Sequence, residues 1–120
     1  MCYMLNKINR LKEDRDIKDV LRYGRQLRIQ SMTCYTKKTN LLVSRFAVIV
    51  SNKVSKSAVS RNLMKRRIRE ILRTNLTSIK TGFDCIVNIK MNITDMKYAK
   101  LEKIVLSSFK TIDILNPDKL

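Results

Sequence analysis

Apolar residues recur along three stretches of the chain at the three- to four-residue spacing of an amphipathic helix. The stretches are 14–23, which ends at Gly24, 58–73, which follows a capping residue type at Ser57, and 95–110, where apolar residues lie among lysines. We therefore predict three helices, whose apolar positions are Ile17, Val20 and Leu21, then Met64, Ile68, Ile71 and Leu72, and last Ala99, Ile104, Leu106 and Phe109.

Three further stretches have the alternation or the continuous apolar run of a strand. Residues 29–36 alternate loosely, 42–50 are rich in Val, Ile and Phe, and 83–91 alternate after Gly82. The turn-like residues 37–40 join the first two, and we expect these two strands to form an antiparallel pair. The resulting order, α-β-β-α-β-α, predicts an α+β fold, a single-domain α/β sandwich with helices over a small sheet.

The strong positive charge of the chain points to its function. Twenty-six Lys and Arg face ten Asp and Glu in 120 residues, a formal net charge of +16. A domain this basic is typical of nucleic-acid binding. An anionic membrane surface is the second option, but the basic helix carries no Trp or Phe, and no run approaches the ~18 apolar residues of a membrane span. The length suits one domain, residues 1–120, with an ordered core of about 8–112.

The three cysteines stand far apart and form no Cys-x-x-Cys pair. Cys2, Cys34 and Cys85 are therefore expected to be reduced thiols of a cytoplasmic protein, buried as small apolar side chains rather than used as metal or redox groups. Residues 1–7 also lack the basic-then-apolar order of a signal peptide.

The densest positive charge lies in the segment 51–73. Cations four residues apart form one ridge of the predicted helix, a second ridge lies beside it, and the apolar stripe faces away from both. Only Glu70 interrupts these cations, whereas a solvated surface helix, the plain alternative, normally mixes both signs. Two loop lysines and the first-turn N–H groups widen the same cationic surface. The predicted RNA-binding residues are Lys53, Lys56, Arg61, Asn62, Lys65, Arg66, Arg69 and Arg73.

Two aromatic residues on the predicted strand pair could stack unpaired bases, an interaction that contributes roughly 1–3 kcal/mol per base. Tyr35 lies in the more polar strand and is the better candidate. Phe46 lies in an apolar strand, where a position in the core is the competing interpretation.

The sequence offers little for catalysis by protein side chains. It contains no histidine, no glycine-rich phosphate loop and no nucleophile motif. The acidic residues are scattered, and Asp16 and Asp19 are expected to be ordinary surface charges of the first helix. We therefore predict no catalytic residue and no metal ligand in the protein, and expect another component to supply any chemistry.

The segments 51–53 and 58–70 read Ser-Asn-Lys and Ala-Val-Ser-Arg-Asn-Leu-Met-Lys-Arg-Arg-Ile-Arg-Glu. This pattern resembles the hallmark of the bacterial ribonuclease P protein component. Weaker matches at 10–24 and 82–87 extend the resemblance over most of residues 8–110. A ribosomal-type protein that coats structured RNA remains the alternative, and a helix-turn-helix DNA binder is disfavoured because strand and loop precede the basic helix.

The resemblance implies a ribonucleoprotein endonuclease that removes the 5′ leader from precursor tRNA. Its RNA subunit performs the hydrolysis with Mg²⁺, while the protein binds that catalytic RNA and the leader. The resemblance also implies a fold like the second domain of ribosomal protein S5. In that fold the basic helix makes a left-handed βαβ crossover, against the right-handed rule that composition and periodicity alone would favour.

The resemblance further implies a central cleft between the first helix and the sheet, which receives the single-stranded leader. Its positions fall on Ile17, Leu21 and Tyr35, and we add Phe46 on the neighbouring predicted strand as a fourth candidate. The chain departs from the family pattern at Leu63, where an arginine is usual, and at Asn52, where a lysine is frequent. Arg67, on the next turn, is a candidate substitute for the missing arginine.

Overall fold

A computed structural model describes residues 6–116. The predicted helices are confirmed, and one short strand and two turns of 3-10 helix are added to the expected order. Ser57 caps the second helix as expected, since its side chain accepts a hydrogen bond of 3.2 Å from the Ser60 N–H. The elements are η1 (Lys7–Asn9), α1 (Asp14–Tyr23), β1 (Arg25–Arg28), β2 (Met32–Lys38), β3 (Arg45–Val50), α2 (Ala58–Thr74), η2 (Leu76–Ser78), β4 (Phe83–Ile89) and α3 (Tyr98–Thr111).

The four strands lie in the order β1-β2-β4-β3, so the strand that is last in the sequence occupies an interior position. β4 pairs antiparallel with β2 and parallel with β3. The predicted antiparallel pairing of 29–36 with 42–50 is therefore wrong. β4, whose side chains are buried over most of its length, takes the place between them because an interior strand is covered on both faces. β3, α2 and β4 form the βαβ unit that the resemblance implies.

The start of β3 is held away from β2 by contacts with the chain that leads into β4. The Ser44 hydroxyl donates to the Lys80 carbonyl at 2.6 Å and accepts from the Phe83 N–H at 3.1 Å. The Thr39 N–H also donates to the Gly82 carbonyl at 2.7 Å. These bonds fix the 39–44 loop against residues 80–83, so β4 enters the sheet between β2 and β3.

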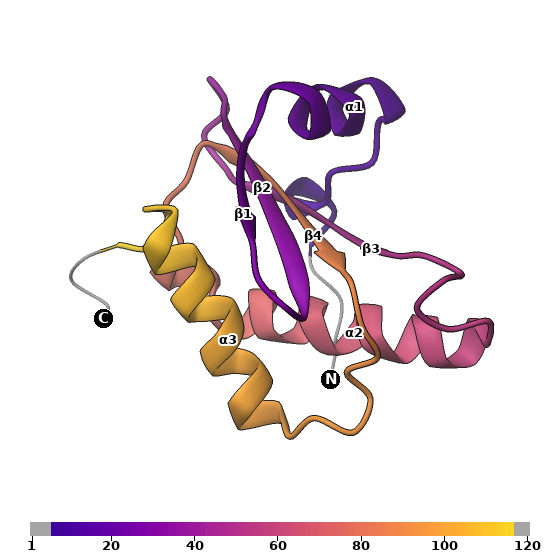
Figure 1. Cartoon of the computed structure of the whole chain (residues 1–120). Coiled ribbons are helices and arrows are strands. Elements are labelled where there is room, and N and C mark those ends of the chain that lie inside the picture. The colour runs from indigo at the N-terminus through magenta and orange to yellow at the C-terminus, as the bar shows by residue number, and fades with distance from the viewer. Residues whose placement is uncertain (1–5, 117–120) are drawn as a thin grey trace.

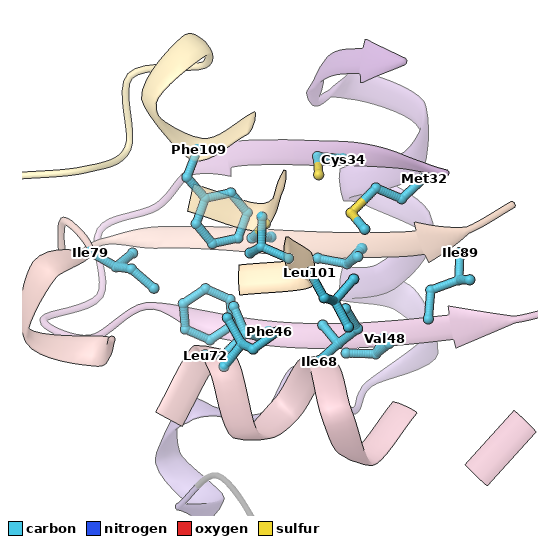
Figure 2. Packing of buried hydrophobic residues seen from close by; sticks show 14 of the residues in the cluster. Met32, Cys34, Phe46, Val48, Ile68, Leu72, Ile79, Ile89, Leu101 and Phe109 are labelled. Atoms are coloured by element: carbon cyan, nitrogen blue, oxygen red, sulfur yellow. The ribbon is translucent and has the colours of Figure 1, made fainter. Parts of the chain in front are cut away.

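The helices cover the two faces of the sheet unequally, as Figure 1 shows with α1 above the sheet and α2 and α3 below it. The larger core joins α2 and α3 to one face and is shown in Figure 2. The smaller core, on the other face, consists of Leu11, Val20 and Ile86. Both faces of β3 and β4 are therefore apolar, but only one of them is covered by two helices.

Cys34 and Cys85 are buried free thiols, as expected, while Cys2 lies outside the described residues. Burial raises the pKa of the Cys34 thiol to about 12 and also raises that of Cys85. Within residues 6–116, no helix combines the length and the apolarity that crossing a bilayer requires.

Candidate nucleic-acid interface

α2 presents the predicted cationic ridges because its apolar stripe is fixed in the core. Met64, Ile68 and Leu72 are fully buried against the sheet. The helix period then places Lys65, Arg69 and Arg73 along one half-buried flank, and leaves Asn62 and Arg66 exposed beyond them. The arrangement offers guanidinium and ammonium groups in a row, with the fork geometry of arginine suited to phosphate oxygens.

The basic loop before α2 is tied to the helix by Arg61. Its guanidinium donates to the Ser55 carbonyl at 2.8 Å, so this arginine shapes the loop as well as carrying charge. Arg61 also lines a cavity of about 430 Å³ together with Lys53, Lys56 and Asn52. The structure therefore brings the two predicted loop lysines and the first predicted helix arginine to one place.

Two arginines crowd together where α2 passes the N-terminal segment. Burial lowers the pKa of Arg69, and the nearby positive charge of Arg10 lowers it further. Four residues on, the Nε of Arg73 is buried and has no hydrogen-bond partner within residues 6–116. Arg69 and Arg73 are thus held where burial disfavours their charge or leaves a donor unpaired, and an anionic partner would offset both.

A family model for ribonuclease P matches residues 5–113. The chain belongs to the ribonuclease P protein component family. It is thus a subunit of the ribonucleoprotein enzyme ribonuclease P, which acts with an RNA subunit in tRNA 5′ processing. The ribosomal-type alternative is not favoured by these matches.

Curated relatives agree with this assignment over most of their length. The ribonuclease P protein component of Fusobacterium nucleatum is 33% identical over 112 residues, which cover 90% of this chain and all of the relative. That of Picosynechococcus sp. is 34% identical over 94 residues, which cover 78% of this chain and 81% of the relative.

Solved structures of ribonuclease P proteins share the fold. The Staphylococcus aureus protein has a TM-score of 0.80 at 25% identity, covering 90% of this chain and 98% of that one. The Thermotoga maritima protein has a TM-score of 0.74 at 26% identity, covering 82% and 92% of the two chains. The expected α/β sandwich of the ribonuclease P protein is therefore confirmed.

In this ribonuclease P protein, two of the predicted cleft positions, Ile17 and Tyr35, gather where α1 crosses the sheet. Ile17 and Tyr35 pack against the smaller core, beside Ala47 and Ile49 of β3. The register places Tyr35, Ile86 and Ala47 side by side across three strands. Leu21 does not join them, because it is exposed on α1 and lines a different hollow with Lys18, Asp19 and Arg22. Ile17, Tyr35, Ala47 and Ile49 form an apolar surface under α1. The Tyr35 hydroxyl accepts a hydrogen bond of 3.4 Å from the Gln26 amide nitrogen.

Phe46 does not join this group. Its ring is 3% exposed and lies in the larger core, on the opposite face of β3 from Ala47. Figure 2 shows the ring between β3 and Leu72 of α2. The core interpretation is therefore the right one, because successive side chains of a strand point to opposite faces and Phe46 alternates with the cleft residues.

Sequence reasoning missed the residues that hold α1 over the sheet. The Arg45 guanidinium donates to both carboxylate oxygens of Asp84, at 2.8 and 2.6 Å, and lies 3.4 Å from a carboxylate oxygen of Asp16. Hydrogen bonding to Asp84 raises the pKa of Arg45. Asp19 adds a contact of 3.7 Å with Lys37. Asp16 and Asp19 are thus attachments of α1 to the sheet rather than ordinary surface charges.

Arg67 does not take the place of the arginine missing at Leu63. Its guanidinium donates to the Thr94 carbonyl, in the loop that leads from β4 to α3. This contact directs the side chain to the flank of α2 that meets α3, away from Arg69 and the N-terminal segment. The hallmark therefore has one cation fewer on its exposed part than the usual family pattern.

Proposed function

We propose that this ribonuclease P subunit binds two RNA segments on two different faces. The single-stranded 5′ leader of precursor tRNA occupies the cleft under α1, and the catalytic RNA contacts α2 and the loop before it. One observation carries the proposal: the apolar cleft and the cationic helix lie on opposite faces of the sheet, so the two RNAs do not compete for one surface.

The cleft suits unpaired bases better than a duplex. Tyr35 supplies a partly exposed ring, and Ile17 and Ala47 supply apolar contact on either side of it. Stacking on such a platform tolerates every base, because each base has a π face. The cleft would therefore hold a leader without reading its sequence closely.

The α2 side suits a folded RNA. Its cations are spread along 17 helical residues and continue into the preceding loop, with Glu70 as the acidic residue of the helix. A row of phosphate contacts of this length positions a structured backbone and gives binding that weakens steeply with salt.

The two carboxylates that share the Arg45 guanidinium do not fit a Mg²⁺ ion. Asp16 and Asp84 are both held by the Arg45 guanidinium, whose positive charge stands where a divalent cation would have to bind. We propose that the RNA subunit holds the Mg²⁺ ions of the reaction, and that the protein acts in the cytoplasm, where the thiols of Cys34 and Cys85 stay reduced.

The test is precursor tRNA cleavage by enzyme reconstituted from this protein and its cognate RNA subunit. Tyr35→Ala should raise the Kd for a precursor with a long leader about tenfold, the loss of one stacked base, and leave a precursor with a one-nucleotide leader unaffected. Tyr98→Ala, on α3, is the matched control and should change neither.

Lys65→Ala should instead weaken assembly with the RNA subunit and reduce the salt dependence of assembly by about one unit. Equal effects of Tyr35→Ala on long and short leaders would remove the cleft from the proposal. An unchanged salt dependence of assembly in Lys65→Ala would contradict the proposed contact between α2 and the catalytic RNA.

A further inference from the structure

A groove of about 320 Å³ runs round the outer edge of the sheet, between the N-terminal segment and α2. β3 is the edge strand here, and the groove touches residues of both its faces. Ala47 and Ile49 belong to the cleft side, whereas Phe46 and Val48 belong to the side of α2. The groove therefore joins the two faces that the proposed function assigns to different RNAs.

The segment before α1 forms the outer wall of the groove and is fixed at Asn9 and Leu11. The buried Asn9 side-chain amide donates to the Ser44 carbonyl at 2.9 Å. The Leu11 N–H donates to the Phe46 carbonyl at 2.8 Å, and the Leu11 side chain is buried in the smaller core. Its neighbours Arg10 and Lys12 both line the groove. Anchoring Leu11 therefore places two cations at this edge, opposite Arg69 of α2.

Charge in the groove is one-sided. Arg10, Lys12 and Arg69 line it, and none of the nine residues found around it is acidic. The hollow lined by Asp16 and Asp19 of α1 is different, since there Arg45 and Lys37 face carboxylates of Asp16, Asp19 and Asp84. The side chains that line the groove are therefore cationic or apolar, whereas the hollow holds charges of both signs.

The crowding of Arg10 and Arg69 supports an anionic occupant. Burial lowers the pKa of Arg69 and the charge of Arg10 lowers it further, so the surroundings disfavour the positive charge of Arg69. A phosphodiester between the two guanidinium groups would accept hydrogen bonds from both and remove the repulsion. The apolar floor under the groove leaves room for a ribose beside that phosphate.

We propose that this groove is a phosphate clamp, in which Arg10, Lys12 and Arg69 hold one backbone phosphate of the leader as it passes round β3 from the cleft toward α2. The inference rests on the proposed function, because it assumes that the leader enters the cleft. The leader is chosen over the catalytic RNA because the groove shares Ile17, Ala47 and Ile49 with the cleft.

The experiment measures precursor binding by the reconstituted enzyme, with a single neutral methylphosphonate moved through successive leader positions. In the native protein, one position should weaken binding roughly tenfold, as expected for one lost charge-assisted contact. Arg10→Gln and Lys12→Gln should each weaken the unmodified precursor and abolish the penalty at that position alone. The control variants Arg28→Gln and Lys103→Gln, exposed on β1 and α3, make the same charge changes. They should leave unaltered the profile, that is, the binding penalty at each methylphosphonate position along the leader.

The outcomes separate this inference from the proposed function. If no variant changes the profile while leader length still affects binding, the clamp is wrong and the cleft stands. If Arg10→Gln weakens assembly with the RNA subunit but not leader binding, the phosphate belongs to the catalytic RNA, and the proposed leader clamp is overturned. If leader length has no effect in the native protein, the proposed function itself fails. Thermal melts of each variant confirm that it folds, and Lys12→Gln, at an exposed site, provides the test if Arg10→Gln does not.

Discussion

The ion pair between Arg45 and Asp84 should contribute more to the free energy of unfolding than any other ion pair found in residues 6–116. Asp84 is 4% exposed, and both of its carboxylate oxygens accept from Arg45, at 2.8 and 2.6 Å. Asp84→Asn removes the negative charge and leaves a largely buried guanidinium with one partner, Asp16, at 3.4 Å. Breaking a buried pair costs about 3–5 kcal/mol, and the 23% exposure of the Arg45 side chain reduces this to about 2–3 kcal/mol.

Urea denaturation followed by circular dichroism measures this loss, and a double-mutant cycle isolates the pair. The coupling energy between Arg45→Gln and Asp84→Asn should reach about 2 kcal/mol. That between Arg45→Gln and Asp16→Asn should stay below about 1 kcal/mol, because the Arg45–Asp16 distance is longer and the Asp16 side chain is more exposed to solvent. Equal coupling energies in the two cycles would refute the reasoning, since burial and two-point contact would then contribute nothing.

Two further perturbations test close packing and buried thiols. Gly24→Ala should destabilise the fold by about 3 kcal/mol in the same urea assay, because a Cβ there would lie 2.5 Å from the Val20 carbonyl oxygen and 2.8 Å from that of Thr36. The control Ser107→Ala, at an exposed site, should change the free energy of unfolding very little. A Gly24→Ala variant as stable as the native protein would contradict the close approach. The folded-state pKa of Cys34, about 12, exceeds the unfolded value of 9.0, so the contribution of its thiol to stability is complete below pH 9 and declines by about 1.4 kcal/mol per pH unit as pH rises toward 12. Cys34→Val should flatten that decline. Alkylation of Cys34 or Cys85 at pH 8 without urea, detected by peptide mass spectrometry, would argue against burial.

The helices could be predicted because their signals are local. The apolar stripe of 58–73 and the cap at Ser57 lie within one segment, and both are present in the structure. β1 was missed because Arg25–Arg28 is polar and mostly exposed, as befits the edge of a sheet. The pairing of the strands could not be predicted, because β2 and β3 are neighbours in the sequence but not in the sheet. No local pattern reveals that β4 enters between them.

The candidate site also has parts that local patterns predict and parts that they do not. The positions of the cationic residues of α2 follow from helix periodicity, but the pattern of the strand does not show which face of the sheet Phe46 lies on. Phe46 and Ala47 are both apolar, so the alternation of β3 does not distinguish the face under α1 from the face over α2. The contributions of Arg45 and Arg10 depend on contacts with residues 39 and 59 positions away, which only the assembled fold supplies.

The late arrival of β4 between β2 and β3 shapes how a newly made chain can fold. A ribosome releases β3 well before residues 83–89, so the apolar strand has no lateral partner for its full length until α2 and β4 have also emerged. Parallel pairing across so long a connection is slow to form. During synthesis, the abundant lysines and arginines would keep such unfinished chains apart through mutual repulsion.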